Sequence, residues 1–84
     1  MAVLPAWDRM PPVSAEAERA ALGSCLMDRE ALETVLEILQ PEDFYDLNHR
    51  AAFEVIHDMA RRERPVDPLT FLEELTRQGK SERL

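Results

Sequence analysis

The chain has 84 residues, of which 45% are hydrophobic and 32% charged, and its formal net charge is −7. This length allows one small domain, and an apolar fraction of this size with only two glycines argues against wholesale disorder. The acidic balance disfavours a general nucleic-acid binder, which would carry a basic patch.

The sequence has no pattern typical of a membrane span, a signal peptide or a disulfide framework, and this bears on the expected cellular location. The longest uncharged stretch, Ala20 to Met27, is far too short to span a bilayer. The N-terminus has no basic region followed by an apolar run, so no signal peptide is expected. Cys25 is the only cysteine, which excludes an internal disulfide and fits a reducing, intracellular site.

Residues 1–13 are expected to form a flexible, extended N-terminal arm. Pro5, Pro11 and Pro12 exclude a regular helix, and the Pro-Pro pair favours an extended path. Trp7, the only tryptophan, lies in this arm. It can be exposed, dock on its own domain or dock on a partner, and the sequence leaves these alternatives open.

Ser14 is placed to cap the first predicted helix, which should run to about Met27. Glu16 and Glu18 fall in its first turn, where negative charge is favoured. Cys25 is interpreted as a small buried hydrophobe, because a reactive thiol would need an activating histidine or a cationic setting. The expected inward stripe consists mostly of small residues: Ala17, Ala21, Leu22, Cys25 and Leu26.

Asp28 is placed to cap a second helix over about Arg29 to Leu39, and Gln40-Pro41 should stop it. Because the junction between the first two helices is short, they should pack as antiparallel or steeply crossed neighbours. A short helical turn, Pro41 to Phe44, follows with proline at its first position. The expected inward face of the second helix consists of Leu32, Val35, Leu36 and Leu39.

The central helix is predicted from about Leu47 to Arg62, because apolar residues recur there at three- and four-residue steps. Val55 is expected to lie off this apolar stripe. Phe44 and Tyr45, just before the helix, can fold back over its first turn. The stripe itself consists of Phe53, Ile56, Met59 and Ala60.

A stiff connector, Arg64 to Pro68, leads to the last predicted helix, about Pro68 to Gln78. Asp67 is a good N-cap, and Gly79 is placed to end the helix. Residues 80–84 look like the truncated start of a further element. The residues expected to face inward are Leu69, Leu72 and Leu75, with Phe71 beside them.

With no strand pattern, the sequence predicts an all-α fold. We expect a small orthogonal bundle of four main helices plus the short helical turn, with residues 14–79 as the folded domain between the arm and the truncated element. The predicted core residues are Leu22, Leu26, Leu36, Phe44, Phe53, Ile56 and Leu72.

No catalytic or metal-binding pattern emerges from the sequence. Gly79-Lys80-Ser81 lacks the upstream glycine and the preceding strand of a phosphate-binding loop. His49 and His57 are eight residues apart on one helix, too far for the i, i+4 pairing that binds one zinc. We therefore expect no catalytic residue, metal or cofactor in this chain. First-turn charges and a cap, rather than a cation site, account for the acidic cluster Glu42, Asp43 and Asp46.

A set of short motifs stands in a specific order between Pro11 and Gly79. The set consists of Pro11-Pro12, Ser14, Glu16-Ala17-Glu18, Ala21-Leu22-Gly23, Leu26, Asp28, Pro41-Glu42-Asp43-Phe44-Tyr45, His49-Arg50, Phe53, Pro65, Asp67 and Thr70. In this order the motifs resemble the N-terminal domain of bacterial replicative hexameric DNA helicases, the DnaB family. The family pattern continues beyond Gly79, so the resemblance implies a fragment. ATP and Mg²⁺ are expected only in the motor domain, which is absent here.

The resemblance implies a non-catalytic protein–protein interaction domain. In such helicases these domains pair, and three pairs form a collar above the motor ring that recruits primase during DNA replication. The implied partners are primase, the sister subunits of the hexamer and a helicase loader, with little direct nucleic-acid binding and no membrane contact. The implied location is the bacterial cytoplasm, in association with the nucleoid.

Five residues are candidates for the partner interface: Tyr45, His49, Arg50, Arg61 and Arg62. Each also has a structural interpretation: Arg50 could pair with Asp43 or Asp46, and cations near a helix C-terminus favour the helix dipole. The alternative function is a small helical nucleic-acid-binding module that uses Arg61, Arg62 and Arg64.

Overall fold

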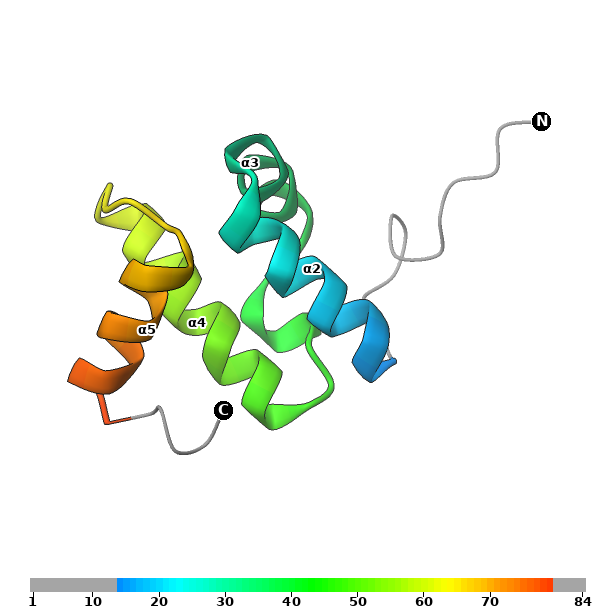
Figure 1. Ribbon diagram of the computed structural model, residues 1–84. Helices are drawn as coiled ribbons and strands as arrows, with labels where there is room; N and C mark the ends of the chain where they lie inside the picture. The colour runs from blue at the N-terminus through cyan, green and yellow to red at the C-terminus, as the bar shows by residue number, and fades with distance from the viewer. Residues whose placement is uncertain (1–13, 80–84) are drawn as a thin grey trace.

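The computed structural model describes residues 14–79, and over these residues the chain is all-α, as predicted (Figure 1). The predicted arm and the residues after Gly79 lie outside the described part. Each α-helix ends within one residue of its predicted end. The elements in chain order are α2 (Ala15–Met27), α3 (Arg29–Ile38), the 3₁₀ turn η1 (Pro41–Asp43), α4 (Leu47–Arg61) and α5 (Pro68–Arg77).

Side-chain caps explain where these helices begin. The Ser14 hydroxyl accepts a hydrogen bond from the Ala17 N–H at 3.0 Å. Asp28 separates α2 from α3: its N–H donates to the Ser24 carbonyl and its carboxylate accepts from the Glu30 N–H. At the start of α5, Asp67 and Thr70 form a reciprocal capping box. Each cap satisfies backbone groups that a helix end leaves unpaired.

Helix α4 lies in the middle of the bundle. It contacts η1 and α2 on one side and α5 on the other, while α3 packs mainly on α2 (Figure 1). Helix α4 begins at Leu47, as predicted for the central helix. No helix among residues 14–79 is long and apolar enough to cross a membrane.

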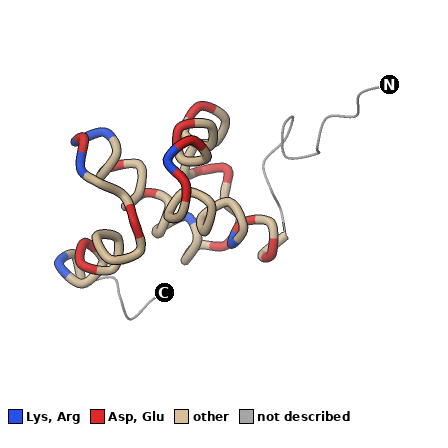
Figure 2. The backbone as a smooth tube through the Cα atoms, turned by 45° about the horizontal axis from the view of Figure 1, so that its top comes forward, with Lys and Arg blue, Asp and Glu red and all other residues tan. Residues whose placement is uncertain are grey.

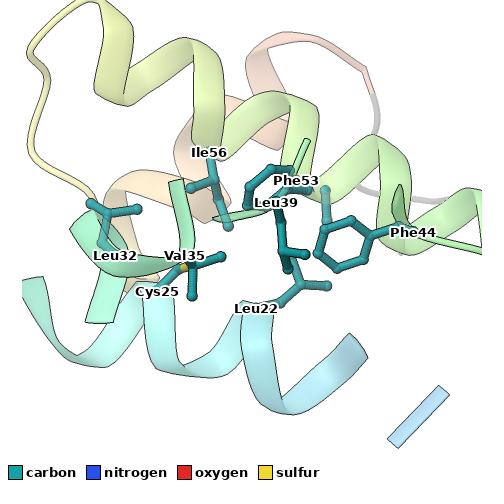
Figure 3. Close-up of a cluster of buried hydrophobic side chains, with 9 residues drawn as sticks. Leu22, Cys25, Leu32, Val35, Leu39, Phe44, Phe53 and Ile56 are labelled. Atoms are coloured by element: carbon teal, nitrogen blue, oxygen red, sulfur yellow. The ribbon is translucent and has the colours of Figure 1, made fainter. Parts of the chain in front are cut away.

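The main core lies between α2, α3 and α4 (Figure 3). The rings of Phe44 and Phe53, both fully buried, stack with centroids 4.8 Å apart. Leu26 and Leu36, expected in the core, are only partly buried and pack against its edge. The buried members are Leu22, Cys25, Leu32, Val35, Leu39, Phe44, Ala52, Phe53 and Ile56.

A second, smaller core joins α4 to α5 and corrects the predictions for three residues, Val55, Leu69 and Leu72. Val55, expected off the apolar stripe, is 1% exposed and packs with Met59 and Leu75, because α5 covers a second side of α4. Leu72, expected in the core, is 55% exposed, and Leu69 is exposed as well. The inward face of α5 instead carries Phe71, Glu74 and Leu75, at three- and four-residue steps.

The turn after α4 has the hydrogen bonds of a Schellman motif. The Arg64 N–H donates to the Met59 carbonyl, and the Glu63 N–H donates to the Ala60 carbonyl. Glu63 therefore adopts a left-handed φ of 59°, a conformation usually given to glycine. Gly79, which follows α5, has φ 72° and agrees with the predicted end of that helix.

Candidate functional site

The candidate contact residues lie at the two ends of α4. Tyr45, His49 and Arg50 are at its N-terminal end, and Arg61 and Arg62 are at its C-terminal end. Among the described residues, no group of three or more His, Cys, Asp or Glu side chains is placed to hold a metal ion. What these residues do is therefore decided by their contacts and their exposure.

A buried carboxylate, Glu18 of α2, organises the N-terminal end of α4. It is 1% exposed and accepts hydrogen bonds from the Tyr45 N–H, from the Asp46 N–H at 3.2 Å and from His49 Nδ1 at 2.8 Å. Sequence reasoning treated Glu18 as a first-turn charge, and the structure shows that its carboxylate ties α2 to α4. His49, whose side chain is 14% exposed, is thereby a structural partner of Glu18.

Arg50 also has a structural role. Its Nε and Nη2 atoms donate to the Phe44 carbonyl at 3.2 and 3.1 Å, which holds the loop before α4 against the helix. The pairing with Asp43 or Asp46, one of the alternatives that the sequence left open, does not form. Asp43 accepts from the Gln40 N–H, and Asp46 caps α4, where the His49 N–H lowers the pKa of its carboxyl.

Tyr45 presents its side chain to solvent. The side chain of Phe44 folds into the core as predicted, whereas Tyr45 is 79% exposed, so the expectation that it covers the first turn of α4 is wrong. Leu47, two residues later, is 72% exposed. Large apolar side chains this exposed are suited to contact with another molecule.

At the other end of α4, a second buried carboxylate gathers the arginines. Glu74 of α5 is 2% exposed and is hydrogen-bonded by Arg77, by Gln78 at 2.7 Å, by Arg64 at 3.2 Å and by Arg62 at 3.3 Å. The hydrogen bonds from Arg77 and then Gln78 lower the pKa of Glu74 to about 2. The carboxylate is therefore charged at neutral pH and anchors the turn between α4 and α5.

These contacts bear on the nucleic-acid alternative. Arg62 pairs with Asp58 as well as with Glu74, and Arg64 pairs with Glu74. Arg61 is more exposed and pairs with Asp58 at 2.9 Å. Figure 2 shows acidic residues interspersed with the basic ones in this region. The arginines thus serve as counter-ions within the fold, a structural role that the sequence alone assigned to the helix dipole rather than to Asp58 and Glu74.

Sequence reasoning missed both buried carboxylates. Glu18 could have been found, because it shares one helix face with Leu22 and Cys25 at four- and seven-residue steps. For Glu74, the sequence shows Arg77 three residues later and Gln78 four residues later, spacings at which side chains on one helix can meet. The approach of Arg62 and Arg64 depends on how α4 and α5 cross.

The fold and these contacts define a small all-α domain whose polar side chains at both ends of α4 mostly hold the helices together. The chain matches the family model of the DnaB-like helicase N terminal domain over residues 10–84, and it belongs to this family. The resemblance found in the sequence is thereby confirmed.

Individual relatives agree with this membership. The chain is 46% identical over 74 residues to the replicative DNA helicase DnaB of Rhodothermus marinus and 46% identical over 68 residues to that of Geobacillus stearothermophilus. These matches cover 88% and 81% of this chain but only 8% and 15% of those proteins. The chain therefore spans a small part of the curated relatives.

A solved structure gives the same result. The crystal structure of the N-terminal domain of DnaB helicase from Mycobacterium tuberculosis matches with a TM-score of 0.80 and 38% sequence identity. The match covers 88% of this chain and 51% of that one, so the chain spans about half of the crystallised domain.

Proposed function

We propose that this chain is a non-catalytic protein–protein interaction domain of a replicative DNA helicase. In this role it contributes to the N-terminal collar of the hexamer and to the recruitment of primase during DNA replication. The observation that carries the proposal is the match of sequence and fold to DnaB N-terminal domains. Residues 14–79 form the helical collar unit, preceded by the arm and followed by the start of a further element.

The catalytic parts belong to the rest of the parent protein in this proposal. ATP and Mg²⁺ bind to its motor domain, and this chain requires no cofactor. The parent works in the bacterial cytoplasm at the nucleoid, where sister subunits, primase and a helicase loader are its partners. The net charge of −7 supports a domain that leaves DNA free to pass and meets basic protein surfaces.

The five candidate contact residues differ in how far their side chains are exposed and in whether other groups of the fold already bind them. His49 and Arg50 are engaged by Glu18 and by the Phe44 carbonyl, and Arg62 is engaged by Asp58 and Glu74. We therefore place the partner contact on Tyr45 and the neighbouring Leu47, with Arg61 as a second, charged point of contact. Exposed aromatic side chains are frequent energetic centres of protein interfaces.

A titration tests the proposal. The C-terminal helicase-binding part of primase is added to this chain and, in parallel, to the full-length parent helicase, and binding is followed by calorimetry. We expect binding that weakens about tenfold or more in Tyr45→Ala, which corresponds to a loss above about 1.4 kcal/mol. Absence of primase binding to the full-length helicase as well would overturn the proposed role.

A matched pair of leucines locates the contact. Leu47→Ala removes an exposed side chain at the start of α4, and Leu69→Ala removes one of similar exposure at the start of α5. We expect only the first to weaken primase binding. Equal effects of the two substitutions would place the contact elsewhere. Strong, salt-sensitive binding of single-stranded DNA to the chain would favour the nucleic-acid alternative instead.

A further inference from the structure

The charged residues of helix α2, Glu16, Glu18 and Arg19, all lie in its first half. Its inner side buries Glu18, Leu22 and Cys25. From Ala20 to Met27 the helix carries no charge at all, and Met27 is 76% exposed. A helical stretch without a charged side is typically covered on both sides, which indicates that something packs on the outer side of α2 over this second half.

An apolar groove of about 510 Å³ lies where this outer side of α2 meets α3. The groove follows the α2–α3 hairpin: Ser24 and Ala31 flank the junction at Asp28, and Ala17 and Leu39 lie at the far end. From Ala17 to Ser24 it extends about 10 Å along the helix, at about 1.5 Å per residue. None of its lining residues is charged: Ala17, Ala20, Ala21, Ser24, Ala31, Thr34, Val35 and Leu39.

We propose that the N-terminal segment of this same chain, residues 1–13, binds in the α2–α3 groove. The segment joins α2 at Ser14, three residues before Ala17, so it enters at the end of the groove farthest from Asp28. Only Asp8 and Arg9 in it are charged. Its larger apolar residues, which match the uncharged groove, are Met1, Val3, Leu4, Trp7, Met10 and Val13.

The length of the segment fits the groove. Seven residues separate Trp7 from Ser14, about 22 Å of extended chain at roughly 3.1 Å per residue. The distance along α2 from Ser14 to Ser24 is about 15 Å at roughly 1.5 Å per residue. A turn at Val13 and Ser14 therefore leaves enough chain for Trp7 to reach the end of the groove formed by Ser24 and Ala31.

Two arguments favour this occupant over a second copy or another protein. Covalent attachment beside the groove gives the segment an effective concentration in the millimolar range, and Pro5, Pro11 and Pro12 reduce the entropy lost on ordering. Residues 1–9 also precede the part matched by the family model. The proposed contact therefore does not rest on the proposed role in primase recruitment.

Trp7 provides the test, because as the only tryptophan it reports on the segment without a label. In the 84-residue chain we expect blue-shifted Trp7 emission and protection from a soluble quencher. Thr34→Glu places a charge in the groove at an exposed position and should shift the emission toward that of free tryptophan. Thr76→Glu makes the same change at an exposed position on α5 and should leave the emission unchanged.

Ala20→Glu, also exposed and in the groove, repeats the test at a second position. Unchanged far-ultraviolet circular dichroism of the three variants shows that each remains folded. Solvent-like Trp7 emission in the unmodified chain would overturn the proposal, as would emission insensitive to both groove variants. A blue shift that disappears on dilution would assign the groove to a second copy and would equally overturn it.

Discussion

The carboxylate of Glu18 and the imidazole of His49, 31 residues apart in the chain, meet inside the fold at 2.8 Å. The same carboxylate accepts from the Tyr45 and Asp46 N–H groups, so one side chain of α2 satisfies the backbone donors of the loop just before α4. Among residues 14–79, no buried side-chain nitrogen or oxygen is left without a hydrogen-bond partner. The order of the loop that presents Tyr45 therefore depends on Glu18.

We predict that Glu18→Ala destabilises the domain by about 3 kcal/mol, because three donors lose a buried, charged acceptor. Urea denaturation measures the change in the free energy of unfolding. Glu16→Ala, at an exposed position in the same first turn, is the control and should cost less than about 1 kcal/mol. Similar losses in both variants would show that Glu18 acts only through the helix dipole.

Glu74 should make stability depend on pH in the acid range. Hydrogen bonds from Arg77 and Gln78 lower its folded pKa from 4.5 to about 2. A depressed carboxyl pKa adds stability that is present above the unfolded pKa of 4.5 and is lost as the pH falls toward 2. The stability advantage of the unmodified chain over Glu74→Gln should therefore shrink across this window.

Urea denaturation at several pH values between about 7 and 2.5 measures this difference. Glu73→Gln, at an exposed neighbouring position on α5, is the control and should track the unmodified chain throughout. An advantage over Glu74→Gln that stays constant from neutral pH to below 4.5 would contradict the assigned pKa.

Phe53→Ala should destabilise the domain by about 3–5 kcal/mol, enough to unfold a domain of this size. Phe53 is fully buried and stacks on Phe44, so its loss leaves a cavity between α2, α3 and α4. Leu72→Ala, at a side chain that is 55% exposed, should change stability by less than about 1 kcal/mol. Thermal unfolding followed by circular dichroism compares the two, and an unchanged midpoint for Phe53→Ala would exclude this core.

The thiol of Cys25 should be unreactive in the folded chain. It is 1% exposed, and burial raises its pKa to about 11. Little thiolate is therefore present near pH 8, and reagents have little access to it. An aromatic disulfide reagent should label Cys25 slowly without denaturant and rapidly in urea. Equally fast labelling in both conditions would show that the α2 side of the core opens readily.

Much of the fold could be predicted from the sequence, because local signals decide it. Ser14, Asp28 and Asp67 cap helices where predicted, and the three- and four-residue steps that begin at Phe53 placed the central helix. These signals act over a few residues, so the helix bounds follow from the sequence within one residue.

Long-range packing could not be predicted in the same way. Leu69 and Leu72 form an apolar stripe as regular as that of Phe71 and Leu75, and only the crossing of α5 on α4 selects the second. That crossing also brings Arg62 and Arg64 to Glu74, which allows a carboxylate to be buried on α5. The periodicity of side chains within α5 does not reveal which charged residues from other parts of the chain lie beside it.

Because the backbone at Glu63 is left-handed, replacing this residue should give a more stable protein for laboratory work. A non-glycine residue in this conformation costs of order 1 kcal/mol or more. Glu63→Gly should recover about that amount, visible as a higher denaturation midpoint. Because Glu63 lies away from Tyr45, Leu47 and the α2–α3 groove, such a variant would ease crystallisation and binding assays while both proposed surfaces stay as they are.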